Sequence, residues 1–392
     1  MKELAATPLR PALRSFETSI FSTITRLAVR HEAINLAQGF PDFDPPAELL
    51  EAADDAIRSG FHQYAPSTGL PELRAAIAAH QAAEYGLEVD PETEVTVTCG
   101  ATEAIWSAAT ALLDAGDELV VIEPFYENYP LLAAPAGAET RFVTTTFPGF
   151  ELDLDRLEAA FSPRTRLVVV NTPTNPSGRV LGPDEIALLG ELAERHDAYI
   201  LSDEAYEHVI FGAARHVPLA SDPRCRERTI SVSTASKTFS ATGWRVGWAL
   251  APPPLTDALR KVHQFVTFAA ATPLQRAVAR MLEVAGGGDY YARLRREYEE
   301  RLDVLLDVLE RTPLEVARPE GAYSFLARCP GDDVEWCGEL VARARVAAIP
   351  GSTFFAGAAG YGLVRFAFCK RVETLREAGE RLLAEPFVTE GR

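Results

Sequence analysis

Residues with reactive or ligand-binding side chains cluster in five short segments of this sequence. The segment STASKTFSATGWRVGW (233–248) places Lys237 among small hydroxylated residues, and Arg245 follows shortly after it. The other candidates, in four earlier segments, are Gly100, Ala101 and Thr102, then Tyr126, then Asn171 and Asn175, then Asp203 and Tyr206. Together the five segments supply donors for a phosphate-type anion, an aromatic ring, an amide, a carboxylate, a phenol and a primary amine. Packing alone does not explain such a set, which is typical of a binding or catalytic site.

All five segments lie at the ends of runs that are typical of buried strands. The runs are EVTVTCG (94–100), DELVVIEPF (117–125), TRLVVVNTP (165–173), AYILSDEAY (198–206) and TISVST (229–234). Helical patterns separate them, including TEAIWSAATALLDAG (102–116) and GPDEIALLGELAERHD (182–197). This alternation predicts an α/β domain with a mostly parallel sheet and helices on both faces. Because ligands bind at the carboxyl ends of such strands, we expect the candidate residues to converge there.

Each candidate also has an ordinary structural explanation. A Gly-Ala-Thr turn before a helix is usually an N-cap, and NPSG (175–178) is a common turn. An aspartate after a strand is more often a cap than a catalyst, and a lone lysine in such a loop is usually solvated. The functional interpretation therefore depends on the joint occurrence of all five segments.

Composition limits the kinds of partner. The chain has 392 residues, of which 47% are apolar, and a net charge of −18 from 38 Lys and Arg against 56 Asp and Glu. Such an acidic surface repels nucleic acid and anionic lipid, so we expect neither nucleic acid nor a membrane as a partner. The N-terminus lacks the apolar core of a secretory signal. The five cysteines are scattered, which argues against disulfides and against a zinc site, and favours the reducing cytoplasm.

The character of the sequence changes near residue 286. Beyond it, the segment 289–312 is typical of one long amphipathic helix, and two strand-like runs follow, GAYSFLAR (321–328) and GLVRFAFC (362–369). We therefore predict a large domain at residues 47–286 and a smaller α+β domain at 287–392. Residues 1–46 are predicted to form an N-terminal arm and part of the small domain.

Several of these motifs resemble the class I and II aminotransferases. The similar segments are NTPTNPSG (171–178), SDEAY (202–206), STASKTFSATGWRVGW (233–248), NLAQGFPDFDPP (35–46) and RFAFCK (365–370). Within that family, the resemblance is greatest to the branch of kynurenine, glutamine and methionine aminotransferases. The resemblance implies the fold of type I enzymes dependent on pyridoxal 5'-phosphate (PLP), with PLP as the cofactor. It also implies a homodimer with shared active sites.

The resemblance implies a role for each residue around the PLP ring. Lys237 would form an imine with the PLP aldehyde and later move a proton. Asp203 would face the pyridine nitrogen and favour its protonated form. Asn175 and Tyr206 would bind the phenolic oxygen of the ring, and Tyr126 would stack on its face.

The resemblance also implies how the PLP phosphate is bound. Arg245 would hold it with a forked, charge-assisted contact, because a guanidinium suits a phosphate better than a point charge does. Thr234 would add a hydroxyl, and Tyr64 of the partner subunit would reach the same group. The backbone N–H groups at the start of the helix after Gly100 would face the dianion.

Substrate binding is implied for a smaller set of residues. Arg365 would bind the α-carboxylate, with help from Asn171 and from the backbone of Gly39. Phe21 would line the side-chain pocket together with Phe268 of the partner subunit.

The chain departs from the kynurenine-type pattern at one point. Those members carry a histidine after the second phenylalanine, where this chain has Ala269, which argues against kynurenine itself as the substrate. The run HQFVTFAAATP (263–273) contains no arginine that could bind a side-chain carboxylate. We therefore expect a neutral side chain on the amino acid rather than a second carboxylate.

Three classes of function remain open at this point. The first is an aminotransferase that moves the amino group of an L-amino acid, such as methionine, glutamine or an aromatic one, to a 2-oxo acid by a ping-pong mechanism. Variants of it act on a specialised biosynthetic amine or on N-succinyldiaminopimelate. The second is other PLP chemistry, a cysteine-conjugate β-lyase or an amino-acid oxidase, because a fold does not fix a reaction. The third, a regulator with a PLP fold, is disfavoured by the intact set of Lys237, Asp203 and Arg245.

Overall fold

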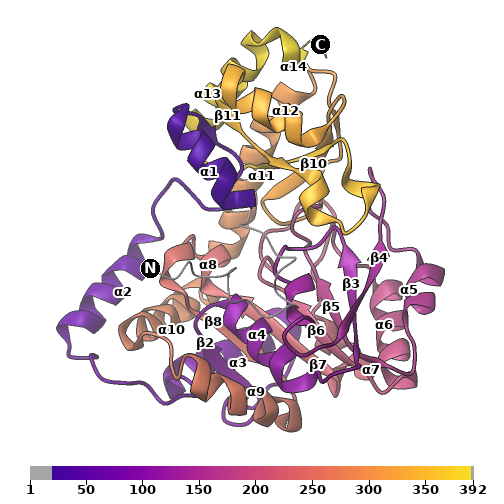
Figure 1. Cartoon of the computed structure of the whole chain (residues 1–392). Coiled ribbons are helices and arrows are strands. Elements are labelled where there is room, and N and C mark those ends of the chain that lie inside the picture. The colour runs from indigo at the N-terminus through magenta and orange to yellow at the C-terminus, as the bar shows by residue number, and fades with distance from the viewer. Residues whose placement is uncertain (1–19, 390–392) are drawn as a thin grey trace, which may run out of the picture.

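A seven-stranded sheet forms the centre of the larger part of the molecule (Figure 1). The computed structural model describes residues 20–389. The strands are β2 (Val95–Thr98), β3 (Glu118–Glu123), β4 (Glu139–Thr144), β5 (Thr165–Asn171), β6 (Tyr199–Asp203), β7 (Thr229–Thr234) and β8 (Gly247–Leu250), in the spatial order β2-β8-β7-β6-β5-β3-β4. Only β8 runs antiparallel to its neighbours, β2 and β7. The carboxyl ends of the other six strands therefore meet at one edge.

Helices cover both faces of this sheet. They are α2 (Ala47–Arg58), α3 (Pro71–Tyr85), α4 (Ala101–Leu112), α5 (Leu154–Ala160), α6 (Pro183–Arg195), α7 (Pro223–Arg226), α8 (Ala235–Thr238), α9 (Pro253–Val266) and α10 (Thr272–Gly286). Short turns of helix lie at η2 (Pro130–Leu132), η3 (Leu219–Ser221) and η4 (Thr242–Trp244). Side chains of α4 and α9 pack on one face of the sheet, and those of α5 and α6 on the other.

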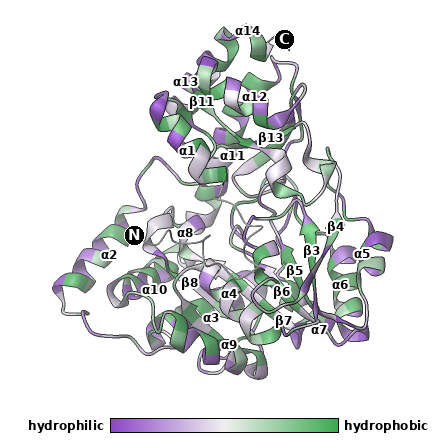
Figure 2. Ribbon diagram, in the orientation of Figure 1, coloured by the Kyte–Doolittle hydropathy of each residue, from purple (hydrophilic) through white to green (hydrophobic). Residues whose placement is uncertain are grey.

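Strand β5 shows why the sheet is buried on both sides. Its residues Leu167 and Val169 belong to the core beneath α4 and α9, whereas Val168 and Val170 belong to the core beneath α5 and α6. Successive side chains of a strand point to opposite faces, so a strand covered on both faces must be apolar throughout. Figure 2 shows this as green strands between helices that are partly purple.

The N-terminal and C-terminal segments build the smaller part together. Its elements are α1 (Ile20–Arg30), β1 (Ile34–Asn35), α11 (Tyr290–Leu309), β9 (Glu315–Val316), β10 (Ser324–Arg328), α12 (Asp333–Glu339), η5 (Leu340–Ala344), β11 (Val346–Ala347), β12 (Ile349–Pro350), η6 (Gly351–Phe354), η7 (Ala358–Gly360), β13 (Leu363–Ala367), α13 (Val372–Ala384) and α14 (Pro386–Thr389). Strands β12-β13-β10-β9 form an antiparallel sheet, and β1 pairs in parallel with β11. Helix α1 packs on this part through Ile24 and Ala28 (Figure 1).

The predicted fold class is confirmed. The α/β alternation, the mostly parallel sheet and the α+β texture of the C-terminal part all occur in the structure. The sequence pattern did not identify β4 at the edge of the sheet or β8 as a strand. The predicted residue ranges of the domains stay predictions.

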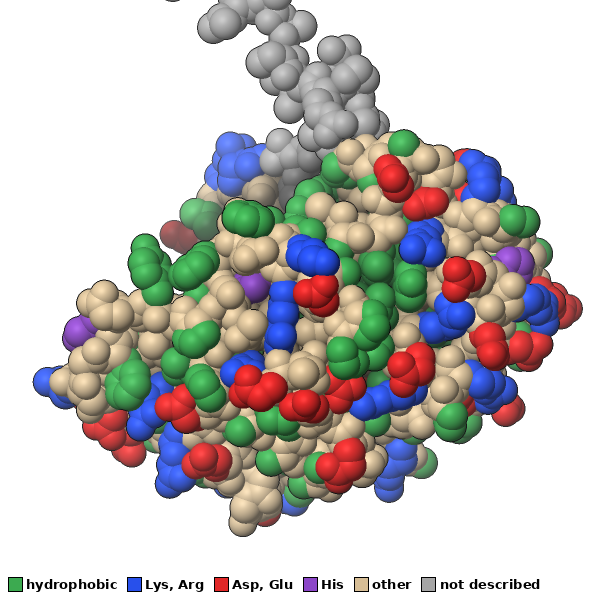
Figure 3. Space-filling model, turned by 90° about the horizontal axis from the view of Figure 1, so that it is seen from below, with side chains coloured by type: hydrophobic (Ala, Val, Ile, Leu, Met, Phe, Trp, Pro, Cys, Tyr) green, Lys and Arg blue, Asp and Glu red, His purple; other side chains and the backbone are tan. Residues whose placement is uncertain are grey.

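The surface carries charges of both signs. Figure 3 shows acidic and basic side chains interspersed over one face of the molecule. Among residues 20–389, the structure contains no helix that is both long enough and apolar enough to cross a membrane. The expected cytoplasmic location stays a prediction.

Candidate active site

A pocket of about 330 Å³ lies at the carboxyl edge of the central sheet. Most of the predicted cofactor residues line it. They come from strand ends, from the loops and helix starts that follow those ends and, for Arg245, from the loop before β8. The lining residues are Ala101, Thr102, Ile105, Tyr126, Tyr129, Asn171, Asn175, Asp203, Ala205, Tyr206, Thr234, Ser236, Lys237 and Arg245. A pocket of this size suits a small, largely enclosed ligand.

Asp203 is the one acidic side chain among these lining residues, and it is buried. The Tyr129 hydroxyl donates to its Oδ2 at 2.7 Å, and the Ala205 backbone N–H donates to its Oδ1 at 3.2 Å. Burial raises the pKa of the Asp203 carboxyl, while the hydrogen bond from Tyr129 acts in the opposite direction. A positively charged atom of a ligand would therefore stabilise the ionised form of the Asp203 carboxyl.

Lys237 approaches the pocket from α8, directly after β7. Its Nζ donates to the hydroxyl of Tyr323 and to the carbonyl oxygen of Gly39, the latter at 3.4 Å. Burial lowers the pKa of the Lys237 amine to about 8. A larger fraction of the amine is then neutral near pH 7 than for an ordinary lysine, and only the neutral amine is a nucleophile.

Arg245 and the start of α4 form the opposite end of the pocket. Gly100 has φ +80, and a Cβ at this residue would lie 2.4 Å from Nη2 of Arg245. Only glycine therefore lets the guanidinium approach this turn so closely. No side chain caps the N-terminus of α4, so the N–H groups of its first turn remain free for an anion.

Arg365, on β13, is not itself a lining residue of the pocket but contacts the lining residue Asn175. Its Nη1 donates to Oδ1 of Asn175 at 3.2 Å, and its Nη2 donates to the carbonyl oxygen of Ala37. The guanidinium lies over the rings of Phe21 and Phe354, 4.8 and 5.2 Å from their centres. Its Nε is buried and has no hydrogen-bond partner among residues 20–389.

Asn171 lines the pocket and also links the strand ends. Its Nδ2 donates to the carbonyl oxygen of Asp203 at 2.8 Å, and its Oδ1 accepts from the backbone N–H of Asn175 at 2.7 Å. Asn171 thereby holds two of the candidate residues in place.

Thr234 has structural partners that bear on its predicted role. Its hydroxyl donates to the carbonyl oxygen of Val246 at 2.9 Å and accepts from the Ser236 N–H at 3.1 Å, so it caps α8. A hydroxyl has a single hydrogen to donate. The predicted phosphate contact of Thr234 stays a prediction, and Ser236, which lines the same pocket, offers a second hydroxyl.

Tyr64 and Phe268 do not line the pocket of their own chain. Their rings contact each other edge to face, with centres 5.3 Å apart. Tyr64 is 87% exposed and Phe268 45% exposed. Their predicted place in the site of a partner subunit stays a prediction.

The sequence analysis did not predict three residues of the site. They are Tyr129, Ser236 and Tyr323. The sequence could have indicated two of them, because Ser236 lies in the motif around Lys237 and Tyr129 lies in the loop after β3. Tyr323 comes from β10 of the C-terminal part, and nothing in its local sequence connects it with Lys237.

A second polar cluster lies apart from the pocket. His80, Glu207 and His208 are all buried, and one ligand-type atom of each lies within 4.8 Å of the others, a spacing that could hold a metal ion. Hydrogen bonds already engage the Glu207 carboxylate, because Tyr85 donates to its Oε2 at 2.9 Å and Ser233 donates to its Oε1. The cluster has the spacing of a metal site and also has hydrogen-bond partners within the protein, so it does not decide whether a metal binds. The expectation that the protein binds no metal stays a prediction.

Comparison with known proteins identifies the family. The model for aminotransferase class I and II matches residues 31–382. The chain belongs to the class I and II aminotransferases. A probable N-succinyldiaminopimelate aminotransferase of Mycobacterium tuberculosis is 42% identical over 387 residues, covering 94% of this chain and 96% of that protein. The methionine aminotransferase of Escherichia coli (strain K12) is 40% identical over 381 residues, covering 96% and 98%.

Solved structures of aminotransferases have the same fold. The N-succinyldiaminopimelate aminotransferase from Mycobacterium tuberculosis superposes with a TM-score of 0.93 at 42% identity, covering 96% of this chain and 99% of that one. A double mutant of the Thermus thermophilus aspartate aminotransferase gives 0.88 at 34% identity, with coverage of 96% and 98%. The names of these aminotransferases give different substrates. Family membership therefore establishes the type of reaction but not the substrate.

Class I and II aminotransferases use PLP, and the residues of this pocket fit it. The fit is chemical at four points: a primary amine at Lys237, a carboxylate at Asp203, an aromatic face at Tyr126 and a guanidinium at Arg245. The close approach that Gly100 allows is further support, because it brings Arg245 beside the uncapped start of α4. This aminotransferase acts on an amino acid and a 2-oxo acid.

Proposed function

We propose that this aminotransferase takes its amino group from an L-amino acid with a neutral side chain, such as methionine, glutamine or an aromatic amino acid. The 2-oxo acid that receives the group binds to the same site after the first product has left, which is a ping-pong mechanism. The observation that carries this proposal is Arg365, whose buried guanidinium beside Asn175 is ready for one carboxylate.

The proposed roles divide the site into a binding part and a proton-moving part. Arg245, the start of α4 and the hydroxyls of Thr234 and Ser236 would hold the cofactor phosphate. Asp203 would accept a hydrogen bond from the ring nitrogen, and Tyr129 donates to that carboxylate and so orients it. PLP supplies the electron sink on which the exchange of the amino group depends.

Lys237 is the proposed attachment point of the cofactor and the carrier of the proton. Once its amine is free, Nζ would take a proton from the substrate α-carbon and hold it for its return. Its pKa of about 8 suits both tasks, because the amine gains and loses a proton near neutral pH. Tyr206 and Asn175, which both line the pocket, would bind the phenolic oxygen of the ring.

The preference for a neutral side chain follows from the charges around the pocket. Arg245 and Lys237 are the only cations among the described lining residues, and both have cofactor roles in this proposal. Arg365 is then left for the α-carboxylate. A second carboxylate would lose its hydration without a cationic partner, whereas an apolar side chain against Phe21 gains about 25 cal/mol per Å² of buried apolar area.

The substrate is tested by a panel of donors. We expect methionine, phenylalanine and glutamine to give a higher kcat/KM than aspartate when all are assayed against one common 2-oxo acid. Production of both the new amino acid and the new oxo acid should accompany each turnover. A higher kcat/KM for aspartate would overturn the proposed preference, and release of ammonia with pyruvate, or uptake of oxygen, would point to lyase or oxidase chemistry.

A second candidate substrate is N-succinyldiaminopimelate. It is supported by the 42% identity to a probable aminotransferase for that compound. The charge argument opposes it, because this substrate carries carboxylates beyond the one that Arg365 would bind. Including it in the same panel separates the two, since a kcat/KM well above that for methionine would require cationic groups other than the described lining residues of this pocket.

We also propose that the active enzyme is a homodimer with shared sites. The support is the exposure of Tyr64 and Phe268, two aromatic residues in contact on the surface, because solvent-exposed aromatic pairs often mark an interface. In this arrangement Tyr64 of one subunit reaches the phosphate in the other, and Phe268 lines the other's substrate pocket.

A further inference from the structure

The Lys237 amine has a specific hydrogen-bond partner that none of the roles above uses. Its Nζ donates to the hydroxyl of Tyr323, and that hydroxyl in turn donates to the carbonyl oxygen of Gly39. Nζ also lies 3.4 Å from the same carbonyl oxygen. A hydroxyl has one hydrogen and two lone pairs, so donation to Gly39 leaves Tyr323 able to act only as an acceptor toward the amine.

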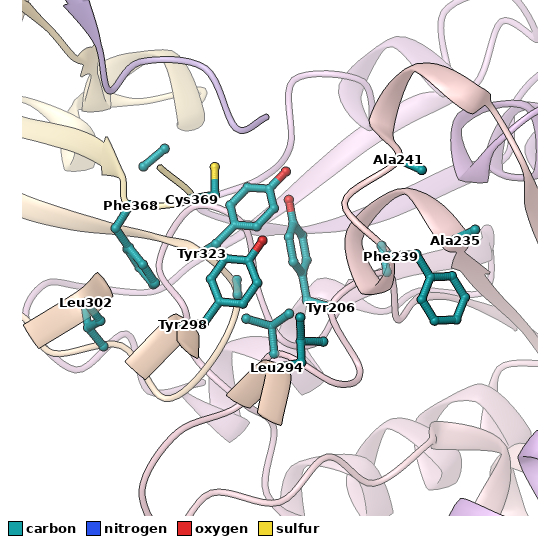
Figure 4. Packing of buried hydrophobic residues seen from close by; sticks show 14 of the residues in the cluster. Tyr206, Ala235, Phe239, Ala241, Leu294, Tyr298, Leu302, Tyr323, Phe368 and Cys369 are labelled. Carbon is teal, nitrogen blue, oxygen red and sulfur yellow. The ribbon is translucent and has the colours of Figure 1, made fainter. Parts of the chain in front are cut away.

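Packing holds the Tyr323 ring in one place. The ring is 2% exposed. It lies edge to face with the ring of Tyr206, 4.9 Å between centres, and stacks on Tyr298 at 6.2 Å. Figure 4 shows the three phenol rings beside one another, with Cys369 next to Tyr323. A Cβ at Gly39 would lie 2.6 Å from the Tyr323 ring, so the N-terminal segment also closes against it.

We propose that Tyr323 is a positioning residue for Lys237, an inference that rests on the proposed attachment role of that lysine. Its hydroxyl fixes the free amine between β10, the N-terminal segment at Gly39 and the pocket, in the state in which the amine is not attached to the cofactor. Without this bond, a lysine side chain with four rotatable bonds would sample several rotamers. Tyr323 therefore sets both the direction of the amine and its affinity for a proton.

The expected direction of the pKa change follows from the groups that face Lys237. Cys369 and Asp203 raise the pKa of the amine, Arg245 and Arg365 lower it, and burial lowers it most. The Tyr323 hydroxyl and the Gly39 carbonyl add two acceptors, and acceptors stabilise the charged ammonium. Removing the Tyr323 hydroxyl should therefore lower the pKa of Lys237 below its value in the unaltered protein.

The test measures the amine directly in protein free of PLP. Trace labelling with acetic anhydride over a range of pH, followed by peptide mass spectrometry, gives the reactivity of each lysine as a titration curve. The chain has only four lysines, so the peptides are easily assigned, and Lys261, whose side chain is 69% exposed, is the internal reference. The proteins compared are the unaltered chain, Tyr323→Phe and Tyr298→Phe.

For Tyr323→Phe, the midpoint of the Lys237 curve should move to lower pH by about one unit, the size expected for loss of one hydrogen bond to a charged group. The curve of Lys261 should not move. Tyr298→Phe is the matched control, because its ring stacks on Tyr323 but its buried hydroxyl has no hydrogen-bond partner among residues 20–389. Its Lys237 curve should coincide with that of the unaltered protein.

Two results would overturn the inference. One is a Lys237 curve in Tyr323→Phe that coincides with that of the unaltered protein. The other is an equal shift in Tyr298→Phe, which would show that general packing of the aromatic rings controls the amine. Failure of the proposed attachment role would look different: PLP added to the unaltered protein and reduced with borohydride would be found on a lysine other than Lys237.

Discussion

Burial acts in opposite directions on the two ionisable side chains at the heart of the site. It raises the pKa of the Asp203 carboxyl and lowers that of the Lys237 amine, because an enclosed site disfavours either charge. Both groups are thereby moved toward the pH at which an enzyme works, which is a common property of catalytic residues. The hydrogen bond from Tyr129 to Asp203 limits the shift of the carboxyl, and the charge of Asp203 limits the shift of the amine.

Replacing Lys237 with alanine should give a folded protein without turnover. The side chain lies in a pocket and not in the close-packed core, so its loss should leave the melting temperature nearly unchanged. The reaction, however, loses its nucleophile and its proton carrier at once. Turnover of methionine should fall to the background rate, and added PLP should wash out on dialysis. Activity in Lys237→Ala would contradict the proposed role.

Replacing Asp203 with alanine should leave PLP bound but remove most of the rate. A loss of at least tenfold in kcat is expected, and each factor of ten corresponds to about 1.4 kcal/mol of barrier. Tyr129→Phe is the matched companion, because it removes only the hydrogen bond to Asp203 and should cause a smaller loss of kcat. If Asp203→Ala retains most of its kcat in a steady-state assay, then Asp203 does not support the cofactor ring.

At the scale of elements, the turn from β2 into α4 brings a guanidinium to a helix N-terminus. Gly100 lies in the turn after β2 with a positive φ of +80, and α4 starts at the next residue without a side-chain cap. Arg245, also in the left-handed region at φ +53, crosses this turn from the loop before β8. Two separate sources of positive potential therefore converge on one point.

Gly100→Ala should weaken PLP binding by displacing Arg245. The new Cβ would lie 2.4 Å from the guanidinium, so either Arg245 or the turn must move. We expect the Kd for PLP, measured by fluorescence titration, to rise at least about tenfold, which is about 1.4 kcal/mol. Gly60→Ala is the control, because Gly60 has a similar φ of +88 with nothing within 4 Å of a Cβ. Its Kd should not change, although it should lose about 1 kcal/mol of stability to backbone strain.

At the scale of the whole molecule, one surface region is unusually aromatic. Phe265 is 85% exposed and lies close in sequence to Phe268, which contacts Tyr64. Large exposed aromatic residues in one region are uncommon on a monomer and suit an interface with a second subunit. The proposed homodimer would cover them.

Shared sites can be tested by mixing two inactive variants. Lys237→Ala and Tyr64→Ala should each have low activity as homodimers. In a mixed dimer both defects fall in one site and the other site is intact. With random mixing, about a quarter of all sites should regain activity. Light scattering of each protein gives the oligomeric state. No recovery in mixtures that contain mixed dimers would show that each subunit builds its own site.

The sequence by itself determined the alternation of elements and the convergence of the strand ends. A run such as LVVV in β5 is typical of a strand covered on both faces, and parallel strands place their ends at one edge. Asn171, Asp203 and Lys237 therefore had to lie near one another. The reason is that the apolar pattern of each strand, and the strand–helix alternation that makes neighbouring strands parallel, are visible in short segments of the sequence.

Only the tertiary structure decided which distant residues complete the site. The pairing of Tyr323 with Lys237, the stacking of Arg365 on Phe21 and the exclusion of Tyr64 from its own pocket all depend on how separate segments pack. Strand β8 was missed for the same reason, because its antiparallel pairing joins β2 to β7 across the fold. Such contacts are fixed by the shape of the whole core, which no short segment of the chain specifies.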